Sequence, residues 1–386
     1  MSKASDLLVD CLEREGVEYV FGLPGEEIED LLFSLRNSTI TFVPVRHEQG
    51  AAFMADVYGR LTGDAGVCLS TLGPGATNLL TGIADATLDK VPVVAITGQG
   101  GLERLHKESH QALDIVAVLA PVTKWNTQIN SPDVIHESVR KAFKVAEWEK
   151  PGATHLALPE DVAVLETEAK PLPRRHRDHL PEPDIRSIKR LENYMVEAER
   201  PIIIAGNGVV RTKAVCRLRE FVELTEIPVT STYMGKGAVS DDDPRSLMTI
   251  NSGDQREAAD AVRIADLIMT IGYDPAEHEP AEWNPKADAT VVHIDTVPAE
   301  VDEHYNPNVE VISDISGSLR VLTERCEEMD LRVDTNWYRD LREHIICEVT
   351  HPPPTVTPSR WQVSCRCCAR RWPTRTCSSP MLEATK

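Results

Sequence analysis

The feature that most constrains this chain is a repeated alternation of short apolar segments with amphipathic helical segments. Apolar runs of four to eight residues predict strands buried on both faces, and helices between such strands indicate a parallel sheet. In the first block the predicted strands are 18–21, 40–45, 66–71, 91–97, 122–128 and 154–158, and the predicted helices are 4–15, 26–36, 48–62, 75–88, 111–119 and 132–149.

A second block repeats this alternation after residues 166–186, whose four prolines and few apolar groups predict a linker. We therefore expect an α/β fold with two doubly wound parallel-sheet domains, 1–165 and 187–330. A helical linker, 331–351, and an irregular tail, 352–386, complete the predicted organisation. In the second block the predicted strands are 201–205, 228–232, 267–271, 291–294 and 309–312, and the predicted helices are 187–197, 213–225, 255–265, 315–328 and 335–349.

Length and charge exclude several classes of protein. The 386 residues suffice for two or three domains. With 61 acidic against 41 basic side chains, the net charge of −20 disfavours contact with nucleic acid phosphates. The sequence contains no run of about 18 apolar residues, so no membrane span is predicted. The segment Met1–Asp6 has no apolar signal core. These features predict a cytoplasmic enzyme.

The tail differs in composition from the rest of the chain. Its last 31 residues, from Val356, hold six basic side chains and one acidic side chain, a net charge of +5. Four of the nine cysteines lie there without the paired spacing of zinc sites. One hypothesis is that residues from about Pro358 are read in a shifted frame; the alternative is a natural basic, cysteine-rich tail.

Two polar segments follow predicted strands of the first block, where parallel sheets bind ligands. Glu48 stands where a strand ends and a helix begins, although by itself it is more typical of a helix-start acid that interacts with the helix dipole. The segment Gly73–Asn78 follows the next strand. Its glycines would let backbone approach a ligand, or would only make a tight turn.

Other motifs give weaker signals. Gly206-Asn-Gly208 follows a strand as in dinucleotide-binding loops, but Arg211 replaces the third glycine. His47, His106 and His110 lack the spacing of a compact metal site. The sequence has no Gly-x-Ser-x-Gly elbow and no phosphate loop.

Taken in order, the motifs of the first block closely resemble the pyrimidine-binding domain of thiamine diphosphate enzymes of the acetolactate synthase group. The second block resembles their central domain, and its segment Ile271–Asn284 is similar to the catabolic, FAD-independent members. FAD is therefore not expected. The motifs that carry the resemblance are Phe21–Gly25, Arg46–Ala55, Tyr58–Arg60, Gly73–Asn78, Ser109–Asp114 and Val122–Asn126.

The resemblance implies a role for individual residues. Glu48 would hydrogen-bond the aminopyrimidine ring of thiamine diphosphate and activate the cofactor, and Gln111 would point into the substrate pocket; these are the expected catalytic residues. Lys124 is a second pocket candidate, with a structural ion pair as its alternative. The residues expected to surround the pyrimidine are Pro24, Gly25, Thr71, Gly73, Pro74 and Asn78.

The implied reaction condenses two pyruvates to 2-acetolactate with release of CO2, a step of branched-chain amino acid biosynthesis. Family members bind Mg²⁺ and the diphosphate through a Gly-Asp-Gly motif, which this sequence lacks. We therefore expect only the pyrimidine half of the cofactor site, no metal ligands and a truncated chain that is inactive alone. It would form a homo-oligomer or pair with a full-length subunit.

Two alternatives remain open at this point. The chain could be related to another thiamine diphosphate-dependent 2-oxoacid decarboxylase or carboligase, because the missing part supplies much of the substrate pocket. It could also be a non-catalytic partner subunit of a full-length enzyme.

Overall fold

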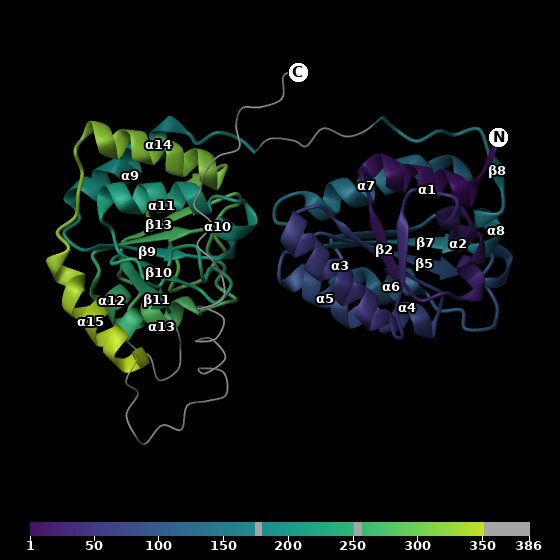
Figure 1. The fold of residues 1–386 in the computed structure, drawn as a ribbon, viewed down its shortest axis with the longest axis horizontal. Helices are drawn as coiled ribbons and strands as arrows, with labels where there is room; N and C mark the ends of the chain where they lie inside the picture. Colours follow the sequence, from purple (N-terminus) through teal and green to yellow (C-terminus); the bar gives the residue numbers. More distant parts are fainter. Residues whose placement is uncertain (174–179, 251–256, 351–386) are drawn as a thin grey trace. The chain divides into compact units, whose positions relative to one another are not determined.

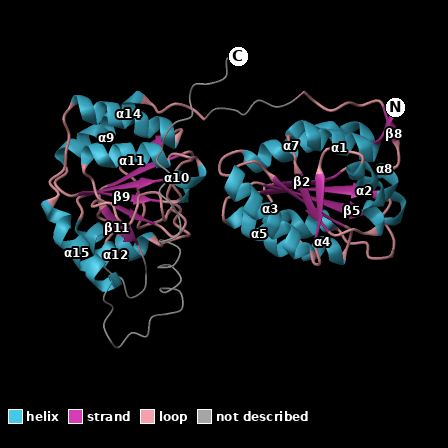
Figure 2. Cartoon of the chain, in the orientation of Figure 1, coloured by secondary structure: helices cyan, strands magenta, loops and turns pink. Residues whose placement is uncertain are grey.

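The computed structural model describes residues 1–173, 180–250 and 257–350 (Figure 1). They form two compact units, one on each side of residues 174–179. Each unit is a parallel sheet covered by helices on both faces (Figure 2), so the predicted fold class is confirmed. The predicted tail, 352–386, lies outside the described residues. Among the described helices, none combines the length and apolar character needed to cross a membrane.

The first unit has a six-stranded sheet in the order β3-β2-β4-β5-β7-β6, in which all neighbours are parallel. A two-residue strand β1 (Ser2–Lys3) pairs antiparallel with β8 (Glu166–Thr167), so the start of the predicted linker belongs to this unit. The sheet strands are β2 (Tyr19–Gly22), β3 (Thr41–Pro44), β4 (Gly66–Ser70), β5 (Val93–Gln99), β6 (Trp125–Gln128) and β7 (Ala153–Pro159).

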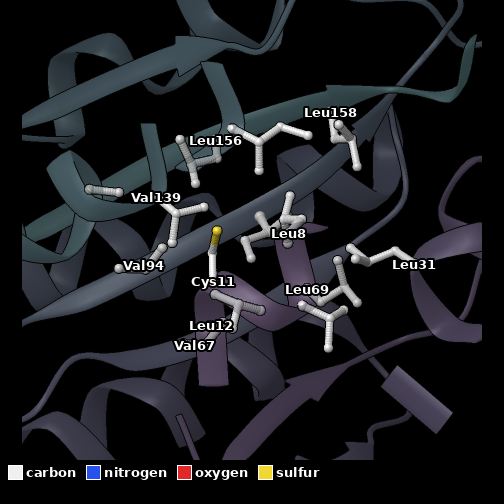
Figure 3. Packing of buried hydrophobic residues seen from close by; sticks show 14 of the residues in the cluster. Leu8, Cys11, Leu12, Leu31, Val67, Leu69, Val94, Val139, Leu156 and Leu158 are labelled. Carbon is white, nitrogen blue, oxygen red and sulfur yellow. The ribbon is translucent and has the colours of Figure 1, made fainter. Parts of the chain in front are cut away.

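Two helical layers cover this sheet. Helices α1, α2 and α7 pack on one face, where Val67 and Leu69 of β4 point (Figure 3). Helices α3 and α5 pack on the other face, with Cys68. Successive side chains of a strand point to opposite faces, and both faces are buried, so the strands are apolar throughout. The helices are α1 (Ala4–Glu15), α2 (Glu29–Arg36), α3 (Glu48–Thr62), α4 (Pro74–Asn78), α5 (Leu80–Leu88), α6 (Ile115–Leu119), α7 (Ile135–Glu147) and α8 (Glu160–Ala163).

The second unit has six parallel strands in the order β11-β10-β9-β12-β13-β14. The sequence predicted five of them; β11 was missed because this edge strand has only four residues, two of them hydroxylated. The strands are β9 (Pro201–Ala205), β10 (Val229–Ser231), β11 (Ser246–Thr249), β12 (Leu267–Ile271), β13 (Val291–Asp295) and β14 (Val309–Ile312).

Helices again cover both faces of this second sheet. Helices α9, α11 and α14 share one core, and α12, α13 and α15 share the other. Helix α9 begins inside the predicted linker 166–186, because the Asp184 carboxylate accepts a hydrogen bond from Ser187 N at 3.0 Å and caps it. The helices are α9 (Ile185–Glu197), α10 (Asn207–Arg211), α11 (Val215–Thr225), α12 (Glu257–Ile264), α13 (Pro280–Trp283), α14 (Ile315–Glu328) and α15 (Asn336–Thr350).

Candidate active site

The residues predicted to surround a cofactor lie at one edge of the first sheet. Strands β2, β3 and β4 are neighbours in the order β3-β2-β4, and because they are parallel their carboxyl ends meet at this edge. Pro24 and Gly25 follow β2, Glu48 follows β3, and the segment Thr71–Asn78 follows β4. Parallel sheets commonly bind ligands at this edge.

Glu48 is the first residue of α3 and is 6% exposed. Its Oε2 accepts a hydrogen bond from Asn78 Nδ2 at 2.9 Å. Its Oε1 lies 3.3 Å from the point where a β-carbon on Gly75 would stand. A buried carboxylate needs hydrogen-bond partners, and Asn78, at the end of α4, supplies one. The structure therefore brings the predicted pair Glu48 and Asn78 into direct contact.

Two glycines let the surrounding loops approach one another. A β-carbon on Gly25 would lie 2.4 Å from the Thr71 Cβ, so only glycine fits against this threonine. Gly73 has a φ of +54°, and a β-carbon there would lie 2.4 Å from the Gln111 carbonyl oxygen. These contacts bring the loop that holds Gln111 to the loop after β4.

A second carboxylate, which the sequence did not predict, stands at the same edge. The Thr71 hydroxyl donates a hydrogen bond to Glu27 Oε2 at 2.7 Å. Glu27 lies in the single turn Glu26–Ile28 after β2. The available signal was an acidic pair directly after the Gly-Leu-Pro-Gly turn, but only the fold shows that Thr71 is its partner.

Gln111 lies in a loop, because helix α6 begins at Ile115 and not at 111 as predicted. The Asp114 carboxylate caps this shorter helix through Ala117 N at 3.0 Å. Gln111 itself is exposed, with a left-handed φ of +52°.

A buried glutamine anchors this loop. Gln99, the last residue of β5, is 2% exposed, and its Nε2 donates to the Leu113 carbonyl at 2.9 Å. Its Oε1 accepts from Gly100 N at 3.0 Å. Gln99 is thus a positioning residue for the segment that holds Gln111. Gln99 lies just after the predicted strand 91–97, but the sequence did not identify it as a positioning residue.

Lys124 does not belong to this edge. It precedes β6, and its Nζ donates to the carbonyl oxygens of Trp148 and Lys150 at 2.7 and 2.8 Å, just after α7. This arrangement satisfies carbonyls near a helix end and supports a structural role for Lys124.

The Tyr58–Arg60 motif is structural as well. Arg60 Nε donates to Asp56 Oδ2 at 2.7 Å, and its Nη2 donates to Asp89 Oδ2 at 2.6 Å. A β-carbon on Gly59 would lie 2.5 Å from the Pro92 carbonyl oxygen. The motif therefore fixes α3 to the segment between α5 and β5.

The three histidines considered as metal ligands, His47, His106 and His110, lie in two different segments. The His47 Nδ1 accepts a hydrogen bond from Gln49 N at 3.2 Å and caps α3, and His106 and His110 are exposed. Among the described residues no cluster of three or more His, Cys, Asp or Glu side chains has a metal-binding arrangement.

The glycines of the weak dinucleotide motif in the second unit pack against the chain itself. A β-carbon on Gly206 would lie 2.3 Å from the Gly272 carbonyl oxygen, and one on Gly208 would lie 2.5 Å from the Gly272 Cα. Gly208 N also donates to that carbonyl at 2.8 Å. These glycines let the segments after β9 and β12 cross closely.

Comparison with known protein families identifies both units. Residues 2–118 match the family described as thiamine pyrophosphate enzyme, N-terminal TPP binding domain. Residues 188–322 match the family described as thiamine pyrophosphate enzyme, central domain. The first match contains Glu48, Gln111 and every residue expected to surround the pyrimidine, and the second contains all six strands of the second sheet.

Curated relatives agree with these matches. A probable acetolactate synthase large subunit of Methanocaldococcus jannaschii is 34% identical over 348 residues, which is 88% of this chain and 59% of the relative. A catabolic acetolactate synthase of Raoultella terrigena is 36% identical, over 84% of this chain and 58% of the relative. An acetolactate synthase of Bacillus subtilis is 34% identical, over 82% and 56%.

The chain thus spans less than two thirds of the length of these relatives. Both family matches, and identities of 34–36% over most of the chain, indicate the same family. The chain belongs to the thiamine pyrophosphate enzymes and contains their N-terminal and central domains.

Proposed function

We propose that the first unit holds the pyrimidine half of thiamine diphosphate and that Glu48 is the carboxyl group that contacts it. The observation that carries this proposal is the burial of Glu48 at the carboxyl edge of the sheet, with one oxygen held by Asn78 at 2.9 Å. Gly25, Gly73 and Gly75 let the loops at this edge pack closely around Thr71, Gln111 and Glu48. These residues fit the cofactor.

The side chains of this unit would bind and orient. Glu48 would exchange a proton with a ring nitrogen, which is general acid–base work suited to a carboxyl shielded from water. Asn78 fixes one oxygen of the Glu48 carboxyl group, so the other oxygen would be directed toward the ring. Pro24, Gly25 and Thr71 would line one side of the ring, and Gly73 and Pro74 the other. Gln111 would contact the substrate.

The reaction that we propose for the complete catalytic unit is condensation of two pyruvates to acetolactate. When bound, thiamine diphosphate supplies the electron sink for decarboxylation of a 2-oxoacid. The support is the set of relatives named acetolactate synthase, including a catabolic one.

We further propose that Mg²⁺ and the diphosphate are held by residues outside this sequence, because it contains no Gly-Asp-Gly motif. They would belong to a longer form or to a second subunit of different sequence. With thiamine diphosphate, Mg²⁺ and pyruvate, the purified chain is then expected to form no acetolactate. Acetolactate formation by this chain alone would refute this second proposal.

Binding tests the first proposal directly. Calorimetric titration of the chain with thiamine and with thiamine diphosphate is expected to give similar weak affinities, because only the pyrimidine is recognised. Glu48→Gln is expected to weaken both at least about tenfold, the effect of losing a charge-assisted hydrogen bond. Glu103→Gln, an exposed acid of the same unit, is the matched control. Equal affinity of Glu48→Gln and the control would overturn the assignment.

A further inference from the structure

The order of strands in the second unit reverses at one point, and this feature is independent of the proposed function. From β9 the chain adds β10 and β11 on one side, and then β12, β13 and β14 on the other. In an open parallel sheet the crevice lies beyond the carboxyl ends of the two strands where the order reverses, here β9 and β12. The segments starting at Gly206 and at Gly272 flank this point.

Glu277 places its carboxyl group at the ends of these strands. Its Oε2 accepts a hydrogen bond from Met234 N, after β10, at 2.9 Å. The Asn207 N–H, after β9, and the Thr232 hydroxyl also hydrogen-bond this carboxyl group. Donors from two neighbouring strand ends therefore converge on one side chain that is contributed by a third, after β12. This is how parallel sheets bind the anionic group of a ligand.

An uncharged donor, the Met234 N–H, holds Oε2 of this carboxyl, whereas Oε1 is buried without a hydrogen-bond partner among the described residues. Burial is the largest influence and raises the pKa of Glu277, and the nearby Asp274 carboxylate raises it further. The hydrogen bonds from Thr232, Met234 and Asn207 act in the opposite direction and favour the carboxylate. A second anion at this point would face both Glu277 and Asp274, so like-charge repulsion would oppose it.

The loop that contains Glu277 is fixed on both sides. Before it, the Asp274 carbonyl accepts a hydrogen bond from Glu277 N at 3.1 Å and the Asp274 carboxylate accepts one from Ala276 N at 3.1 Å. After it, the buried Tyr273 hydroxyl donates to the His278 carbonyl and accepts from Trp283 Nε1. The position of Glu277 is thus set by the fold of its own loop.

We propose that Glu277 is an internal ligand of the second unit: its carboxylate fills the anion position of the crevice between β9 and β12. The same contacts tie the 272–279 loop to the ends of β9 and β10. Because the chain occupies this position itself, anions such as inorganic phosphate or a nucleotide phosphate are excluded from it. Loss of the carboxylate would open a site of the size and charge preference of a small carboxylate.

Hydrogen exchange with chemical rescue tests this proposal. In Glu277→Ala, peptides covering 232–236 and 272–279 are expected to exchange faster than in the parent chain. Acetate or formate is expected to restore much of the protection, whereas sodium chloride at equal ionic strength is not. Glu279→Ala, an exposed acid two residues away, is the matched control and should respond to neither salt. Equal exchange with acetate and with chloride in Glu277→Ala would overturn the proposal.

Glu277→Gln provides the second measurement should the alanine variant fold poorly. Its side chain still fills the crevice but replaces one carboxylate oxygen with an amide NH2 group, which donates hydrogen bonds and cannot accept them. We expect faster exchange of Met234 N–H than in the parent chain. Acetate should not restore this protection, because the crevice stays filled. Met234 N–H protection equal to that of the parent chain would contradict the proposal.

Discussion

The two units share a plan but use a carboxylate at the sheet edge differently. In the first unit Glu48 is held by one side chain, Asn78, and its second oxygen is directed toward Gly75. In the second unit Glu277 is held by groups from two neighbouring strand ends, including the Met234 N–H. The comparison teaches that the kind of partner differs between the two sites: a side-chain amide orients Glu48, whereas backbone donors after neighbouring strands orient Glu277.

The largest expected effect concerns the glycine geometry of the first site. Gly73→Ala forces a β-carbon to within 2.4 Å of the Gln111 carbonyl oxygen at a φ that disfavours side chains. We expect the unfolding free energy of the first unit to fall by about 3 kcal/mol, measured by calorimetry. Gly50→Ala, whose β-carbon would meet nothing within 4 Å, is the control. Equal stability of the two variants would show that the loops do not need this close approach.

Acid is expected to weaken the first unit through a buried histidine. His155 hydrogen-bonds the Thr97 hydroxyl, and burial lowers its pKa to about 3. The unfolded state then binds the proton more readily, so stability present above pH 6.5 is lost as the pH falls toward 3. At pH 5 the loss is about 2 kcal/mol. Denaturant titrations should show that the unfolding free energy of the parent chain falls with pH by this amount and that this fall is absent in His155→Gln. The variant of an exposed histidine, His106→Gln, should behave like the parent.

Removing the partner of Glu48 should have a smaller effect on stability. Asn78→Ala leaves a carboxyl that is 6% exposed without the amide donor, and we expect a loss of about 1–2 kcal/mol. Thiamine binding should weaken together with stability. Binding that survives Asn78→Ala unchanged would mean that Glu48 needs no orientation, and the contrast between the two carboxylates would fail.

The smallest expected effect has the opposite sign to that of His155. The pKa of Glu277 is raised in the folded unit, so its folded state binds the proton more tightly. The stability from this group is present below the unfolded pKa and is lost as pH rises through the folded value. Relative to Glu277→Gln, the parent chain should lose stability in the second unit as the pH rises above about 4.5. A parent chain that gains stability relative to Glu277→Gln as the pH rises would contradict this sign.

Much of the fold could be predicted because both faces of each sheet are buried, which makes strands such as β4 and β9 continuously apolar. The site residues Glu48 and Asn78 were predicted from motif order. Glu27, Gln99 and Glu277 were not, because the meaning of each depends on a partner that only the fold brings near: Thr71, Leu113 and Met234. Helix starts were misplaced where Asp114 and Asp184 act as caps.

The two-residue pairing of β1 with β8 has a consequence for how the first unit can be handled. It places the first residues of this unit beside its last strand, so chain entry and exit lie at one point (Figure 1). A unit with adjacent ends can be circularly permuted through a short connection, or inserted into a loop of another protein, without cutting its central sheet. The edge for which we propose pyrimidine binding could therefore be transplanted as one piece.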